Sequence, residues 1–414
     1  MKKIGVISIR FLLLSLTVAS NLLQAQTCQN NKLCLETQSC KNVRTRIDEV
    51  QTALDDCCAS LTSRCQAISA CVGNCDKGTA IDQDFMNNEF PQIGQPGLYC
   101  LIESVTGELG IDANDVIINM NNFVITSTAI NCISAIDVDH LSILGNGVLE
   151  NASNAALSLT NCTDVIVDTI LFQNNNDGIQ TSTVNGFVVR NSNFQNCTNN
   201  AISLNGVLNG VGRSCLIDAG SDQSVVVDAS SSNISFDSVL VRGSTNDNWL
   251  VDGQNCTFLN CTAHEGTNGF TFGASASDCY CRQCNAYQNS ADGFVVTGTK
   301  LILSDCLSLN NTGTGFVVNS VDSCLQNCAA KENGGNGFAV NGTQNYIHAT
   351  IALANSASGY AVGGTDPVLL SNYAEANGTN YSGITDPIVT YTISNGLFSP
   401  IDFPSIWQNI DAQP

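Results

Sequence analysis

The stretch "LNNTGTGFVV" at residues 309–318 is one copy of the repeat that decides the fold. The chain reads "YQNSADGFVV" at residues 287–296, "KENGGNGFAV" at residues 331–340 and "LANSASGYAV" at residues 353–362, so the same frame returns every 22 residues. A unit of this length cannot bury its own apolar face, and neighbouring units must therefore stack on one another. The register predicts a repetitive stacked architecture rather than a conventional globule.

Residues at equivalent positions of stacked repeats lie above one another, so each repeated residue type predicts a column. Stacked asparagine amides can hydrogen-bond along such a column, and stacked aromatic rings can fill a narrow interior. Asparagine also tolerates left-handed backbone at a tight turn, and the glycine before each aromatic residue, such as Gly315, suits a turn that a Cβ would hinder. The predicted structural columns are Asn289, Asn311, Asn333, Asn355 and Asn377, then Phe294, Phe316, Phe338 and Tyr360, and finally Cys261, Cys284, Cys306 and Cys328.

The cysteine column leaves two interpretations open. Neighbouring Cα atoms one strand spacing apart, about 4.8 Å, lie inside the range that a disulfide requires. Alternatively these residues are small buried thiols that fill an inner corner. Parallel in-register Cβ vectors suit the disulfide dihedral poorly, which favours buried thiols.

Short alternating apolar runs such as "GFVV" and "KLILSD", separated by Gly, Asn and Ser turns, are typical of three strands per repeat. With this pattern the chain resembles the right-handed parallel β-helix, or pectate-lyase-like, superfamily over roughly residues 95–395. The resemblance implies about thirteen coils in a rod on the order of 60 Å long. We therefore expect an all-β solenoid over residues 81–395, preceded by an α-helical coiled-coil stalk.

The N-terminal part of the chain has a different pattern. Residues 1–25 combine Lys2 and Lys3 with the apolar run "FLLLSLTVAS" and a small residue at Ala25, which predicts a secretory signal peptide. In the cysteine-rich segment 26–80, apolar residues and cysteines recur every seven positions over residues 40–75, typical of a coiled coil. We expect a homo-oligomer, a dimer or trimer, through residues 40–75, possible interchain disulfides included. An amphipathic helix packed on its own domain is the alternative.

The C-terminal residues 396–414 leave the repeat. Pro400 and Pro404 interrupt strand pairing, and the apolar residues between and after them offer a cover for the last coil. An uncovered parallel edge invites aggregation, so we expect this segment to cap the β-helix. A partner-binding tail is the alternative.

Composition restricts the partners and the compartment. The chain has 36 acidic residues against 15 Lys and Arg, a net charge of −21 at pH 7. Such a surface repels nucleic acid, and it repels polyanionic polysaccharides unless cations bridge them. The 21 cysteines fit an oxidising compartment. We expect a secreted, periplasmic or cell-surface protein with no transmembrane segment and with a polysaccharide or cell-surface glycan as a possible partner.

The resemblance also implies chemistry to look for, since pectate lyases use an acidic calcium cluster with an Arg base and polygalacturonases use clustered Asp residues with a His. Residues 81–414 contain no Asn-Thr-Asp, Asp-Asp, Gly-His-Gly or Arg-x-Lys element. His140, His264 and His348 are far apart in the repeat register and form no catalytic pair. We therefore expect a structural, adhesive or glycan-binding role. The alternative is a carbohydrate-active lyase, hydrolase or epimerase with a non-standard site.

Three aspartates are candidates for a metal site. Asp115, Asp139 and Asp164 each precede an apolar run and are 24 and 25 residues apart, roughly one coil. If they stack, three carboxylates lie close together and would bind a hard cation such as Ca²⁺. The alternative is that each aspartate caps its own turn. Calcium is the one cofactor that the sequence suggests.

Overall fold

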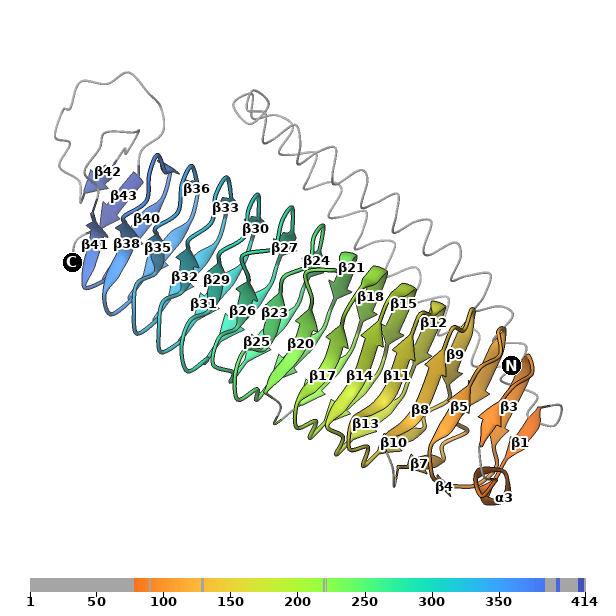
Figure 1. Ribbon diagram of the computed structural model, residues 1–414. Helices are drawn as coiled ribbons and strands as arrows, with labels where there is room; N and C mark the ends of the chain where they lie inside the picture. The colour runs from red at the N-terminus through yellow and green to blue at the C-terminus, as the bar shows by residue number, and fades with distance from the viewer. Residues whose placement is uncertain are drawn as a thin grey trace, which may run out of the picture. The chain divides into compact units, whose positions relative to one another are not determined.

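A computed structural model describes residues 78–383, apart from residues 89–90, 128–129, 219 and 221, together with two short strands near the C-terminus. The described chain forms three parallel sheets of 14, 15 and 14 strands, in which each strand pairs with the equivalent strands of neighbouring coils (Figure 1). This is a parallel β-helix of about fourteen turns, which confirms the predicted solenoid and adds one turn to it. The predicted signal peptide at residues 1–25, and the predicted coiled coil at residues 40–75 with its oligomer, lie outside the described residues.

The strands are assigned to sheets 1, 2 and 3 in the order in which each coil visits them, and one short helix, α3 (Gln83–Met86), precedes the first complete coil. Sheet 1 contains β1 (Thr79–Ile81), β3 (Gly97–Leu101), β6 (Val116–Asn119), β9 (Leu141–Leu144), β12 (Thr163–Asp168), β15 (Val184–Arg190), β18 (Val207–Arg213), β21 (Ser232–Asp237), β24 (Thr257–Leu259), β27 (Tyr280–Arg282), β30 (Ile302–Ser304), β33 (Cys324–Gln326), β36 (Tyr346–His348) and β39 (Val368–Leu370). Sheet 2 contains β4 (Val105–Thr106), β7 (Val124–Thr126), β10 (Val148–Glu150), β13 (Leu171–Gln173), β16 (Asn193–Gln195), β19 (Leu216–Asp218), β22 (Leu240–Arg242), β25 (Thr262–His264), β28 (Asn285–Tyr287), β31 (Leu307–Leu309), β34 (Ala329–Lys331), β37 (Ile351–Leu353), β40 (Tyr373–Glu375), β42 (Thr392–Ser394) and β43 (Asn409–Ala412). Sheet 3 contains β2 (Gln92–Ile93), β5 (Leu109–Ile111), β8 (Asn131–Ile136), β11 (Ala155–Thr160), β14 (Asp177–Ser182), β17 (Asn200–Leu204), β20 (Gln223–Val227), β23 (Trp249–Val251), β26 (Phe270–Phe272), β29 (Phe294–Val296), β32 (Phe316–Val318), β35 (Phe338–Val340), β38 (Ser358–Val362) and β41 (Thr379–Ser382).

Each coil turns three corners, and each corner uses a residue with left-handed backbone. In one coil these are Asp305 (φ 56°), Asn310 (φ 54°) and Asp322 (φ 57°). Asn and Asp adopt this conformation more readily than other residues with a Cβ. The prediction that the ladder asparagines themselves are left-handed is wrong, because the left-handed residue is Asn310 and the ladder member is the next residue, Asn311.

The glycine of the repeat also has a different role from the one predicted. Gly315 has no left-handed backbone. A Cβ at this position would lie 2.6 Å from the carbonyl oxygen of Gly337 and 2.9 Å from the amide nitrogen of Asn333. The glycine is required because the next coil approaches it closely, not because of its backbone dihedrals.

The aromatic column is confirmed and forms the centre of the core. Phe294, Phe316 and Phe338 stack with centroid distances of 4.8 Å and interplanar angles of 4°. Tyr360 continues the stack 5.0 Å beyond Phe338. All four side chains are fully buried. Because the strand spacing nearly equals the stacking distance of flat rings, one aromatic residue per coil fills this interior without gaps.

The asparagine column is confirmed as a buried ladder at the corner between sheets 2 and 3. Both the backbone N–H and the side-chain amide of Asn289 donate to Oδ1 of Asn311, at 2.9 and 2.8 Å. The same pair of bonds joins Asn311 to Asn333 (3.1 and 3.0 Å) and Asn333 to Asn355 (3.1 and 2.9 Å). Asn377 accepts the corresponding pair from Asn355, at 2.9 and 2.8 Å. Each side chain thereby satisfies a backbone donor that the corner would otherwise bury without a partner.

The cysteine column consists of buried thiols at the corner between sheets 1 and 2. Cys261, Cys284, Cys306 and Cys328 are all at most 1% exposed, and none of them forms a disulfide. Burial raises the pKa of the Cys284 thiol, and it raises that of Cys197, a buried thiol in another coil, to about 12. Since the thiolate is the reactive form, these side chains are chemically inert in the folded protein.

We predict that all four column cysteines react with an alkylating reagent only after unfolding, and without prior reduction. Peptide mass spectrometry of protein alkylated in denaturant, beside protein alkylated in native buffer, measures this. Full labelling of Cys261, Cys284, Cys306 and Cys328 is expected in the first sample and almost none in the second. A peptide pair cross-linked through two of these residues would contradict the prediction.

The C-terminal strands continue sheet 2 past the last complete coil. The backbone of β43 pairs in parallel with β40, and β42 pairs with β43. The predicted tail at residues 396–414 therefore returns to the sheet through β43 and lengthens it, instead of leaving the repeat throughout. Among the described residues, no helix is long and apolar enough to span a membrane.

Candidate functional site

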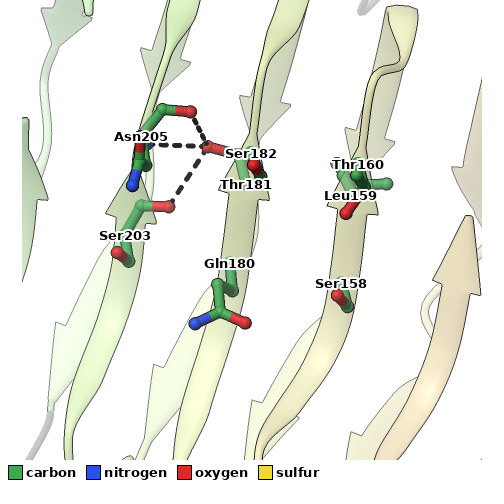
Figure 2. A pocket seen from close by; sticks show the side chains of 8 residues that line it. All are labelled: Ser158, Leu159, Thr160, Gln180, Thr181, Ser182, Ser203 and Asn205. Atoms are coloured by element: carbon green, nitrogen blue, oxygen red, sulfur yellow. Dashed lines mark hydrogen bonds between the residues drawn. The ribbon is translucent and has the colours of Figure 1, made fainter. Parts of the chain in front are cut away.

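A polar groove lies on the outer face of sheet 3 where three consecutive strands end (Figure 2). Its cavity has a volume of about 260 Å³ and crosses β11, β14, β17 and the residues that follow them. The lining residues are Ser158, Leu159, Thr160, Gln180, Thr181, Ser182, Ser203 and Asn205. All eight are uncharged, and seven of them have a polar side chain.

Strand pairing arranges the outward side chains of the groove in two columns. Ser158, Gln180 and Ser203 pair directly across the three strands. Thr160 pairs with Ser182 in the second column, and Asn205 follows in the next coil. Since successive side chains in a strand point to opposite faces, both columns lie on the outer surface, two residues apart. The groove therefore presents a regular array of hydroxyl and amide groups.

The wall between these columns is held from the inside by Thr181. This side chain is 2% exposed, and its Oγ1 donates to the carbonyl oxygen of Ser203 at 3.3 Å. The same Oγ1 accepts the backbone N–H of Asn205 at 3.0 Å (Figure 2). These bonds fix the backbone on which Asn205 is displayed, so the polar array is supported by buried hydrogen bonds.

The groove has hydrogen-bonding groups but no acid or base. Hydroxyl and amide side chains donate and accept hydrogen bonds without ionising near neutral pH. General acid–base catalysis requires a side chain that exchanges a proton with the reacting group. The lining alone is suited to binding a polar, uncharged molecule rather than to transforming it.

Strand pairing shows a sequence signal for the groove that the period alone does not reveal. The column of Ser158, Gln180 and Ser203 continues through Val226 and Leu250 and then, in later coils, through Val295, Val317 and Ala339. The outward position is polar in the three groove coils and mostly small and apolar afterwards. Comparison of this one position along the aligned repeats would have located the groove.

The three aspartates proposed as a calcium site do not form one column. Register places Asp115, His140 and Asp164 in line, with His140 Nδ1 3.1 Å from Asp115 and Nε2 3.4 Å from Asp164. Asp139 lies one position away, where it pairs with Thr163 and accepts the Thr163 hydroxyl. The stacking prediction is therefore wrong for Asp139. Within the part of the chain that the structure describes, no cluster of three or more His, Cys, Asp or Glu side chains is arranged to hold a metal ion.

The other two histidines lie on different sheets. His264, at the end of β25 in sheet 2, stacks on Tyr287 with a centroid distance of 4.2 Å, and its Nε2 is 2.7 Å from Gln288 Oε1. His348 ends β36 in sheet 1, and burial lowers its pKa. The structure does not bring these two residues together.

The arginines on the rod are each paired with a carboxylate. The pairs are Arg190 with Asp168 at 2.8 Å, Arg213 with Asp237 at 3.5 Å, Arg242 with Asp218 at 2.6 Å and Arg282 with Asp305 at 3.6 Å. Their guanidinium charges are therefore neutralised locally, and none of these residues lines the groove.

Three parallel sheets wound into one solenoid, with an internal asparagine ladder and an aromatic stack, define the pectate-lyase-like class, and this chain has that fold. No protein-family model matches the chain, and no similar curated protein is found.

Three solved structures with this fold illustrate the range of proteins that adopt it. A mutant of the periplasmic alginate epimerase AlgG is 12% identical, with a TM-score of 0.39 over 80% of this chain and 82% of its own. An exopolygalacturonase from Thermotoga maritima is 10% identical, with a TM-score of 0.38 over 70% of this chain and 84% of its own. PfbA, a surface adhesin of Streptococcus pneumoniae, is 11% identical, with a TM-score of 0.33 over 68% and 82%. At these identities the similarity concerns the fold alone.

Proposed function

We propose that this protein is an exported β-helix rod that binds carbohydrate through the polar groove of sheet 3. The observation that carries the proposal is the regular array of hydroxyl and amide side chains on three successive coils, with no ionisable group among them. Sugars offer many hydroxyl groups, which such an array can match with neutral hydrogen bonds. The buried support of Thr181 favours a preformed site, which loses little entropy on binding.

Export is the second part of the proposal. It rests on the charged, then apolar, N-terminal sequence that ends in a small residue at Ala25, and on the high cysteine content. A rod with a buried, columnar core is a rigid way to display one binding face at a surface. We accordingly propose a secreted, periplasmic or cell-surface location.

Removal of two groove side chains tests the binding site. The double substitution Gln180→Ala and Ser203→Ala should cost about 2 kcal/mol of binding free energy, roughly 30-fold in Kd, because at least two hydrogen bonds to the sugar are lost. Retention on immobilised neutral and uronic polysaccharides identifies a binding glycan, and titration calorimetry then measures Kd for both proteins.

A control variant comes from the same face of the same sheet. Val295→Ala with Val317→Ala changes two outward positions of the same column in later coils and should leave Kd unchanged within about twofold. If no glycan is retained, or if the groove variant binds as tightly as the control, the proposal fails. New reducing ends or unsaturated-uronate absorbance during incubation would instead support the carbohydrate-active enzyme, acting outside the groove lining.

A further inference from the structure

We propose that the groove selects uncharged glycans and rejects their carboxylated, uronic counterparts. This inference rests on the proposed function, since it names the class of carbohydrate that the groove accepts. It follows from fixed negative charges at the ends of the groove, from the absence of a base in its lining and from an apolar side chain at its rim.

One end of the groove is closed by carboxylates. The column that contains Ser182 and Asn205 continues into the next two coils with Asp228 and Asp252. Each coil adds about 4.8 Å, so Asp228 stands about one strand spacing beyond Asn205. A glycan that lies along the column would bring any carboxylate of its own close to these charges.

Asp228 is connected to the groove and held in its charged form. Its Oδ1 accepts the backbone N–H of Ser230 at 2.7 Å and the Ser230 hydroxyl at 2.5 Å. These hydrogen bonds lower the pKa of the Asp228 carboxyl. The Ser230 hydroxyl also lies 3.3 Å from Oδ1 of Asn205, a lining residue. The negative charge is therefore fixed in position beside the binding surface.

The opposite end carries further acidic residues and one exposed apolar side chain. Register places Ile136, which is 56% exposed, directly before Thr160 in the second column. Asp112 occupies the next position back in that column, and Asp137 follows Ile136 in the chain, both exposed. The C–H face of a neutral sugar can pack on the isoleucine, whereas a carboxylate would meet two like charges.

No arginine compensates these charges. The nearest coils carry Arg190 and Arg213, but both lie at the far ends of their sheet 1 strands, at the corner between sheets 1 and 2, and pair there with Asp168 and Asp237. Guanidinium groups are the usual partners of carboxylates in proteins. A uronic acid in this groove would therefore be desolvated with no counter-charge from the lining.

Chemically matched probes test this selection. We would use neutral polysaccharides, each beside a counterpart whose C6 hydroxymethyl group has been oxidised to a carboxylate, and measure Kd for both by calorimetry. At about 0.01 M salt the carboxylated member should bind about tenfold more weakly, and at about 1 M salt, where the Debye length falls to about 3 Å, the gap should shrink to about twofold. Asp228→Asn should narrow the low-salt gap by about threefold.

A matched control separates a local from a general charge effect. Asp366→Asn removes one exposed carboxylate in a remote coil and changes the net charge equally, so the gap should stay at its wild-type value. Equal affinities for the two members at low salt, or a gap that Asp366→Asn narrows as much as Asp228→Asn does, would overturn the inference and leave the proposed function in place. Binding of neither member would overturn the proposed function itself.

Discussion

Substitution of Asn311 with alanine should lower the free energy of unfolding by about 4 kcal/mol, because it interrupts the buried ladder in the middle of the rod. Asn289 directs its backbone N–H and its side-chain amide at Asn311 Oδ1, at 2.9 and 2.8 Å, and both donors would lose their acceptor. The carbonyl oxygen of Ala286 would lose the Asn311 amide, 3.1 Å away. Each buried polar group left without a partner costs about 1–3 kcal/mol.

Two measurements check the ladder prediction. Urea denaturation gives the change in the midpoint, and hydrogen exchange reports whether the backbone amide of Asn289 becomes labile. Asn341→Ala is the matched control, because Asn341 also donates to an asparagine one coil away, at 3.1 Å from Asn319 Oδ1, but is exposed. It should change stability by less than about 0.5 kcal/mol. Equal effects of the two substitutions would show that ladder burial contributes nothing.

The core of this protein is predictable from sequence because every column repeats with a fixed period. The aromatic and asparagine columns follow from a 22-residue spacing, and the structure places them in register as expected. One coil advances the chain by one strand spacing, so period alone determines which side chains meet. The period does not identify which of two adjacent asparagines, Asn310 or Asn311, points inward.

Errors occurred where a shift of one residue decides the outcome. Asp139 is one position out of line with Asp115 and Asp164, and in a strand a shift of one residue moves a side chain to the other face. The spacing of 24 and 25 residues between these aspartates could not show that shift, because the corners absorb extra residues. The occupant of the column, His140, was visible in the sequence but carried no periodic signal.

The groove was not predicted for a related reason. Its members are common residues such as Ser158 and Ser203, which an Asn-, Ser- and Thr-rich chain contains everywhere. Their meaning lies in the position they share on the outer face of sheet 3, which becomes visible only when strand pairing is known. Repetition therefore specifies the scaffold, while departures from the repeat on the outer face specify the candidate site.

Substitution of Phe316 with alanine should lower the free energy of unfolding by about 3–5 kcal/mol, the usual effect of removing a buried phenylalanine. Phe316 is fully buried between Phe294 and Phe338, each 4.8 Å away, and the tightly packed coils around Gly315 leave little room to collapse into the cavity. Calorimetric or urea unfolding of the full chain measures the loss. Val317→Ala, at the neighbouring outward position, is the control and should cost less than about 1 kcal/mol.

Glycan affinity of the Phe316→Ala protein gives the second readout. The groove lies on β11, β14 and β17, five coils before β32, and the structure of a solenoid depends mainly on contacts between neighbouring coils. At a temperature where the variant is folded, Kd should therefore match that of the wild type within about twofold. A large loss of affinity without loss of stability would mean that the aromatic column takes part in recognition, and the division between a periodic scaffold and a non-periodic binding face would then be wrong.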